Sequence, residues 1–146
     1  MDAVLTSLIA VLGTLGGSLG ALILQQRATT RAERRRELHT VGATFLTALT
    51  SYRRAVYVLS TLTPDADRTA AIADVRQTRA ALTAARDALL LIATEPDVHR
   101  AVHAAIGAAF DLGDDAEQQR VTTGRQAALD AHNEVLNALG IAIRST

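Results

Sequence analysis

The residues with the spacing of a metal site are Glu95, His99 and His103, which follow one another at intervals of four. On a helix this spacing places the three side chains on one face, where imidazole and carboxylate groups can share a divalent cation. The HExxH pattern of zinc hydrolases is missing, because no glutamate follows the first histidine. We therefore favour the other interpretation, in which both histidines hydrogen-bond to neighbours beside an apolar stripe, and we predict no metal and no cofactor.

Other patterns that support catalysis are also missing from the sequence. There is no cysteine, which excludes thiolate chemistry, disulfide bonds and cysteine-ligated metal centres. The five serines lie in the apolar segment, within expected helices or at the end of the chain, and not in a strand-to-helix turn that would expose a nucleophile. No strand pattern precedes a glycine-rich loop, so a P-loop or a dinucleotide-binding turn is not expected. The sequence predicts a protein without enzymatic activity.

The first 26 residues are almost free of charge. Residues 3–24 carry no charged side chain, and as a helix they would be about 33 Å long, close to the hydrocarbon thickness of a bilayer. A basic run follows, made of Arg27, Arg31, Arg34, Arg35 and Arg36. By the positive-inside rule, these features predict a transmembrane anchor at residues 1–26, with the amino terminus outside and residues 27–146 in the cytoplasm. The alternative is the central helix of a soluble bundle.

The basic run between residues 27 and 36 has three interpretations: a topology signal, a contact with anionic lipid, or a contact with DNA. Arginines within a Debye length of lipid head groups are attracted without a specific site, so we expect these five to lie at the membrane surface. Direct contact with nucleic acid is not expected. No aromatic residues interleave with the arginines, and residues 38–146 carry ten arginines against twelve acidic residues.

Small residues recur within the predicted anchor. Two overlapping GxxxG motifs contain Gly13, Gly16, Gly17 and Gly20. Small residues let two helix backbones approach closely, which favours association of helices in lipid. We therefore expect this face to associate with its copy in a homo-oligomer.

The rest of the chain has helical periodicity. Apolar residues recur at spacings of three and four from Leu38 to Leu59, and capping signals occur at Thr63-Pro64-Asp65, at Thr94-Glu95-Pro96-Asp97 and after Gly113. These signals predict helices over about 27–62, 64–93, 96–112 and 115–143. The face expected to be buried on the last helix comprises Val121, Leu129, His132, Leu136, Leu139 and Ile143. The predicted fold is all-α: a single N-terminal transmembrane helix continuous with a cytoplasmic antiparallel four-helix bundle.

Two segments carry a resemblance to a known family. The run GTLGGSLGALILQQRATTRAERRRE at residues 13–37 and the segment Ser51-Tyr52-Arg53-Arg54-Ala55-Val56 resemble the KilB-like small membrane proteins of actinobacterial, Streptomyces-type conjugative plasmids. Those proteins open with an apolar, glycine-rich helix followed by Gln-Arg and a charged stretch. The resemblance implies a small membrane protein of plasmid transfer or spread, with no catalytic motif.

Taken together, these expectations describe a non-enzymatic, membrane-anchored helical scaffold that self-associates and serves plasmid transfer. Its expected partners are the lipid bilayer, copies of itself and other transfer or envelope proteins. Two alternatives stay open. One is a membrane-perturbing protein of a phage or plasmid, holin-like or an exclusion factor. The other is a ligand-sensing bundle with its ligand near Tyr52, His99 and His103.

Overall fold

The computed structural model describes the backbone of residues 2–63, 68–114 and 118–145, and the side chains of residues 29–63, 68–112 and 124–145. Four helices occupy these ranges: α1 (Asp2–Thr61), α2 (Thr69–Ile92), α3 (Pro96–Asp114) and α4 (Gln118–Ser145). All the regular structure in the described backbone is helical, which confirms the predicted all-α class.

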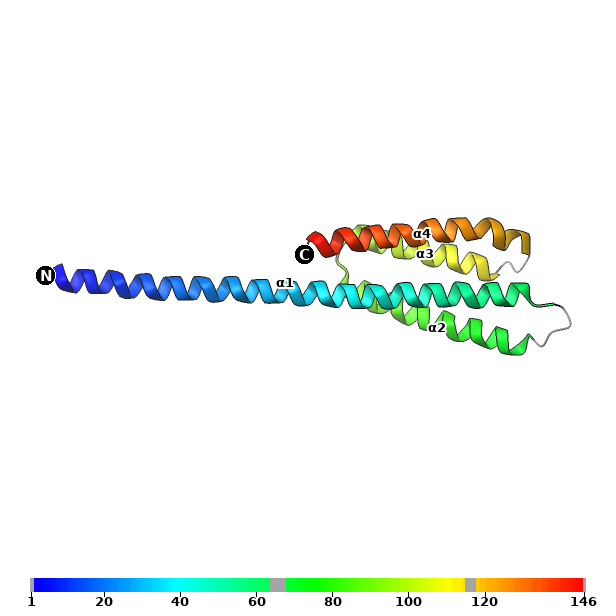
Figure 1. Ribbon diagram of the computed structural model, residues 1–146, viewed down its shortest axis with the longest axis horizontal. Coiled ribbons are helices and arrows are strands. Elements are labelled where there is room, and N and C mark those ends of the chain that lie inside the picture. The colour runs from blue at the N-terminus through cyan, green and yellow to red at the C-terminus, as the bar shows by residue number, and fades with distance from the viewer. Residues whose placement is uncertain (1, 64–67, 115–117, 146) are drawn as a thin grey trace. The chain divides into compact units, whose positions relative to one another are not determined.

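The chain divides into two units, Met1–Arg36 and Glu37–Thr146. We call the second unit the bundle. It contains the last part of α1 and the whole of α2, α3 and α4, which run alternately up and down, so that sequence neighbours are antiparallel (Figure 1). Short connections between helices of similar length favour this arrangement.

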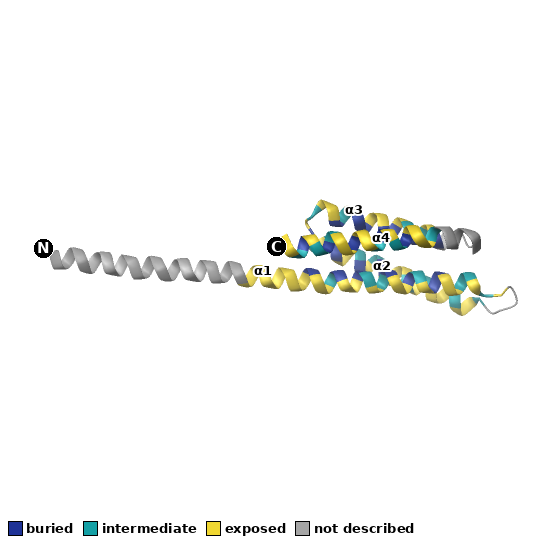
Figure 2. Cartoon of the chain, turned by 45° about the horizontal axis from the view of Figure 1, so that its top comes forward, coloured by how far each residue is buried: buried dark blue, intermediate teal, exposed yellow. Residues whose placement is uncertain are grey.

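The predicted localisation is contradicted by the structure. Within the residues that it describes, no helix has an apolar stretch long enough to cross a membrane. Exposed residues recur along the described parts of all four helices (Figure 2). On α1 they include Arg31, Arg34, Arg35 and Arg36, whose charges the bilayer interior does not solvate. The predicted single-pass protein with an outward amino terminus and a cytoplasmic bundle is thus corrected. The side chains of the expected span, residues 3–24, lie outside the described ones.

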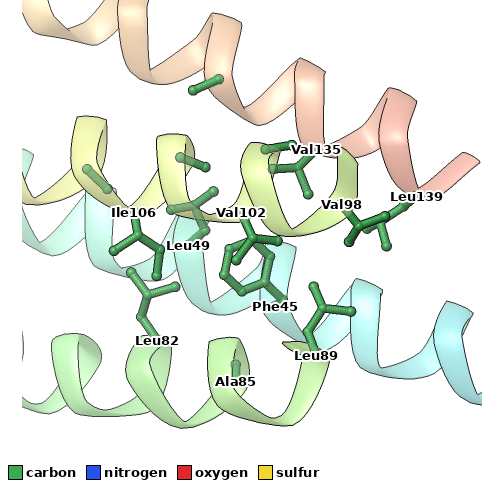
Figure 3. Packing of buried hydrophobic residues seen from close by; sticks show 14 of the residues in the cluster. Phe45, Leu49, Leu82, Ala85, Leu89, Val98, Val102, Ile106, Val135 and Leu139 are labelled. Carbon is green, nitrogen blue, oxygen red and sulfur yellow. The ribbon is translucent and has the colours of Figure 1, made fainter. Parts of the chain in front are cut away.

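The core of the bundle is built from aliphatic residues and alanines of all four helices. Phe45 and Leu49 of α1 are fully buried, and side chains from α2 and α3 converge on them (Figure 3). The aromatic rings of Tyr52 and Phe110 meet edge to face, with centroids 5.5 Å apart. Because edge-to-face contact aligns the positive ring edge with the negative ring face, this pair adds to the stability that burial gives.

The buried face of α4 differs from the predicted one. Leu136, expected in the core, is 46% exposed, whereas its neighbour Val135 is fully buried. The residues of α4 that are buried in the described part are Ala128, Ala131, Val135, Leu139 and Ala142. The prediction followed the larger side chains and was wrong for this reason: α4 packs through its alanines, which permit a closer approach to α3 than leucines would.

The connections between helices are fixed by local hydrogen bonds. α2 begins at Thr69, five residues beyond the predicted start; the predicted cap around Pro64 falls on residues 64–67, outside the described ones. The Arg68 guanidinium donates to the Leu59 carbonyl oxygen at 3.5 Å, near the carboxyl end of α1. α3 begins at Pro96, a residue whose fixed φ suits the first helical turn.

Gly42 allows α1 and α4 to approach closely. A Cβ atom at this position would lie 3.0 Å from Cδ1 and 3.4 Å from Cδ2 of Leu139, which is itself buried. Gly107 on α3 is different, because nothing lies within 4 Å of an added Cβ there. A side chain added at Gly42 is therefore expected to destabilise the bundle, whereas one added at Gly107 is expected to meet no obstacle.

We predict that Gly42→Leu lowers the free energy of unfolding by about 1–3 kcal/mol, because the added side chain overpacks the contact with Leu139. The matched control, Gly107→Ala, should raise it by about 0.5–1 kcal/mol through helix propensity alone. Urea unfolding followed by circular dichroism measures both. Equal effects of the two substitutions would contradict the close contact between α1 and α4.

Candidate functional site

The structure places Glu95 and His99 at the connection between α2 and α3. His99 Nε2 donates to the Ala93 carbonyl oxygen at 2.6 Å, and a Glu95 carboxylate oxygen accepts a hydrogen bond from the Thr94 amide at 3.0 Å. His103 is exposed. Among the described residues, no three potential ligands are arranged to hold a metal ion. The local geometry gives His99 a structural role, in which its ring satisfies the carbonyl at the end of α2.

We expect His99→Ala to lower the free energy of unfolding by about 1 kcal/mol, because the Ala93 carbonyl loses its partner. His103→Ala is the matched control and should have no effect, since that side chain is exposed. Thermal unfolding with and without a chelator measures both. A metal-dependent rise in melting temperature that both substitutions abolish would contradict this assignment.

The other predicted sites are only partly covered by the described residues. Gly13, Gly16, Gly17 and Gly20, which we expect to mediate helix association, lie outside the residues whose burial the structure describes, and so does Arg27. The remaining arginines of the basic run are all exposed on α1: Arg31, Arg34, Arg35 and Arg36. Their roles stay predictions.

A pocket that the sequence did not indicate lies between α1 and the facing parts of α3 and α4. Its volume is about 340 Å³, within the range of small-molecule sites. We call it the arginine pocket; its lining residues are Thr50, Arg53, Arg54, Val56, Tyr57, Leu112 and Arg125. Val56 and Leu112 are buried, so the pocket combines an apolar wall with cationic and hydroxyl groups. Gly124 makes room for this wall, because a Cβ there would lie 2.8 Å from Leu112 Cδ2.

No carboxylate among the described residues pairs with the arginines of the pocket. In the described part of the chain, Arg53, Arg54 and Arg125 make no ion pair and no side-chain hydrogen bond. Burial, and then the charge of Arg125, lower the pKa of Arg53 below its ordinary value. A guanidinium stays protonated at neutral pH, so the lowered pKa means that partial burial, together with the like charge of Arg125, disfavours the charged form of Arg53 in the folded chain.

His132 extends this cationic region along α4. Burial and the neighbouring charge of Arg53 lower its pKa below the usual histidine value, and its buried Nδ1 has no hydrogen-bond partner among the described residues. His132 lines a second pocket of about 360 Å³ with residues of α1, and Thr50 lines both pockets. The two pockets therefore adjoin on the α1 and α4 side of the bundle.

Sequence reasoning missed the arginine pocket because its residues are far apart in the chain. Arg53 and Arg54 were noted only as part of a family-like segment, and Arg125 lies more than seventy residues later. One signal was present: Arg125 and His132 are seven residues apart and so share a face of their helix. The register between α1 and α4 places Arg125 near Arg53, and the sequence alone does not give this register.

The lowered pKa of His132 predicts a pH dependence of stability. The folded chain favours neutral His132, so below about pH 6.5 the unfolded chain binds more protons at this residue than the folded one does. The contribution of His132 to the free energy of unfolding is therefore full above this pH and falls as the pH drops toward the folded pKa. Urea unfolding between pH 5 and pH 8 should show a shallower slope for His132→Gln than for wild type. A slope of the opposite sign, or one that His132→Gln leaves unchanged, would contradict the lowered pKa.

The fold and the pocket together define the class of protein: a helical bundle with an aliphatic core and a cationic pocket on its side. The family model of the KilB plasmid transfer protein matches residues 39–141. The chain is also 36% identical over 141 residues to the Protein KilB of Streptomyces lividans, covering 91% of this chain and 94% of that protein. The chain therefore belongs to the KilB plasmid transfer protein family, as the resemblance predicted. No solved structure matches it.

Proposed function

We propose that this chain acts in plasmid transfer as a non-enzymatic helical scaffold, which self-associates and binds other proteins through the surface of its bundle. Its membership of the KilB plasmid transfer family supports the process. The interior supports the scaffold role: every buried side chain in the described part of the chain is hydrophobic, and no polar or charged residue is buried there. The polar and charged groups of the described residues that could contact a partner therefore lie at or near the surface.

The observation that carries the proposal is that the two most exposed large hydrophobic residues of the described chain lie at the same end of the bundle. Leu91 on α2 is 85% exposed and Ile141 on α4 is 61% exposed. The two helices run in the same direction, so both residues lie near the carboxyl ends of their helices and at the same end of the bundle (Figure 1). Exposed apolar residues of this size contribute most of the binding energy when a partner covers them.

We expect the full-length chain to form an oligomer whose mass, measured by light scattering after size exclusion, falls in the double variant Leu91→Gln and Ile141→Gln. Both residues are exposed, so the variant should keep its helical circular dichroism and its melting temperature. The matched control is Ile72→Gln, which makes the same change near the other end of α2 and should leave the mass unchanged.

Two results would contradict parts of this proposal. A chain that stays monomeric at every concentration would overturn self-association. An oligomer that withstands the double variant but dissociates with Gly17→Leu would place the interface in the glycine-rich segment instead of on the bundle surface.

A further inference from the structure

We propose that the arginine pocket binds the phosphoryl group of a nucleotide-sized phosphate ester. The source is either a free nucleotide or the phosphate of a DNA strand. The inference goes beyond the proposed scaffold role and does not depend on self-association.

The donors in the pocket suit a phosphoryl group. Arg53 and Arg54 come from α1 and Arg125 from α4, so cations approach the pocket from two helices. Guanidinium groups are planar and present paired donors that match phosphate oxygens in a bidentate manner, and they are always charged. Tyr57 also lines the pocket and carries a hydroxyl donor. An anion here would make charge-assisted hydrogen bonds with guanidinium groups that no carboxylate among the described residues engages.

Two arginines outside the pocket pair with a nearby carboxylate on their own helix. Arg86 contacts the carboxylate of Asp87 at 2.7 Å, and Arg100 contacts that of Asp97 at 3.0 Å. The three arginines of the pocket have no such partner in the described part of the chain. Burial, and then the like charge of Arg125 in the same pocket, lower the pKa of Arg53. A bound dianion would convert this repulsion into attraction.

The size and the wall of the pocket favour an ester over a bare inorganic ion. A volume of about 340 Å³ leaves room for more than a phosphate group. The apolar side chains of Val56 and Leu112 form part of the wall, and the half-exposed ring of Tyr57 offers a face on which a base can stack. The polar part of the ligand would thus meet arginines while its ring meets apolar and aromatic surface.

The test is calorimetric titration of the full-length chain at physiological salt with four probes: pyrophosphate, ADP, adenosine and a 5′-phosphorylated oligothymidylate. We expect ADP to bind more tightly than pyrophosphate, and adenosine, which lacks the phosphoryl groups, not to bind. Arg125→Gln and Arg54→Gln should each weaken ADP binding about 10- to 100-fold, the usual effect of losing a hydrogen bond to a charged group. Both residues are exposed, so neither variant should unfold the chain.

The matched control is Arg144→Gln, which removes the same charge from an exposed position on α4 outside the pocket and should leave ADP binding unchanged. Tighter binding of the oligothymidylate than of ADP, lost in the same two variants, supports the proposal and assigns the source to a DNA strand. Absence of binding by every phosphorylated probe at millimolar concentration overturns it. An equal loss of ADP affinity in Arg144→Gln and Arg125→Gln also overturns the proposal, since ADP binding would then depend on the net charge of the chain alone.

Discussion

The close approach of α3 and α4 through alanine is the contact on which the rest of the bundle depends. The interior combines a few large side chains, among them Phe45, Leu49 and Tyr52, with alanines that let helix backbones come close together. Ala101, Ala105 and Ala109 of α3 are buried, as are Ala128, Ala131 and Ala142 of α4, and Cα atoms of the two helices come within 8 Å of each other. This pair forms one side of the core on which Phe45 and Leu49 of α1 pack (Figure 3).

The position of α4 determines which of its residues lie beside α1. Gly42 gives Leu139 room at one level of the bundle, and along the same pair of helices Arg125 and His132 come beside Arg53. A packing requirement in the core therefore has an electrostatic consequence at the surface: cations from two helices share a pocket without a carboxylate partner among the described residues. Guanidinium groups that share a pocket match the paired oxygens of an anion, and this geometry points to an anionic ligand.

The sequence predicted the all-α class because the apolar spacing is local, and the stripe from Phe45 to Val56 is buried as its period requires. The predicted buried face of α4 was wrong at Leu136, because the prediction favoured large side chains. The smaller Val135 and the alanines of α4 are buried, and Leu136 is exposed. The predicted single-pass topology combined the uncharged run of residues 3–24 with the positive-inside rule, and it is contradicted within the described residues. The arginine pocket could not be predicted, because periodicity gives the face of each helix but not the register between α1 and α4.

Helix packing places Arg53 and Arg125 in one pocket, where the charge of Arg125 lowers the pKa of Arg53. A double-mutant cycle on the free energy of unfolding, with Arg53→Gln, Arg125→Gln and both together, measures the coupling of the two residues, because packing losses specific to either substitution cancel. We expect Arg125→Gln to stabilise the chain more when Arg53 is present than when it is already replaced. Equal effects in both backgrounds, or a larger loss of stability with Arg53 present, would show that the two guanidinium groups do not repel each other in the folded chain.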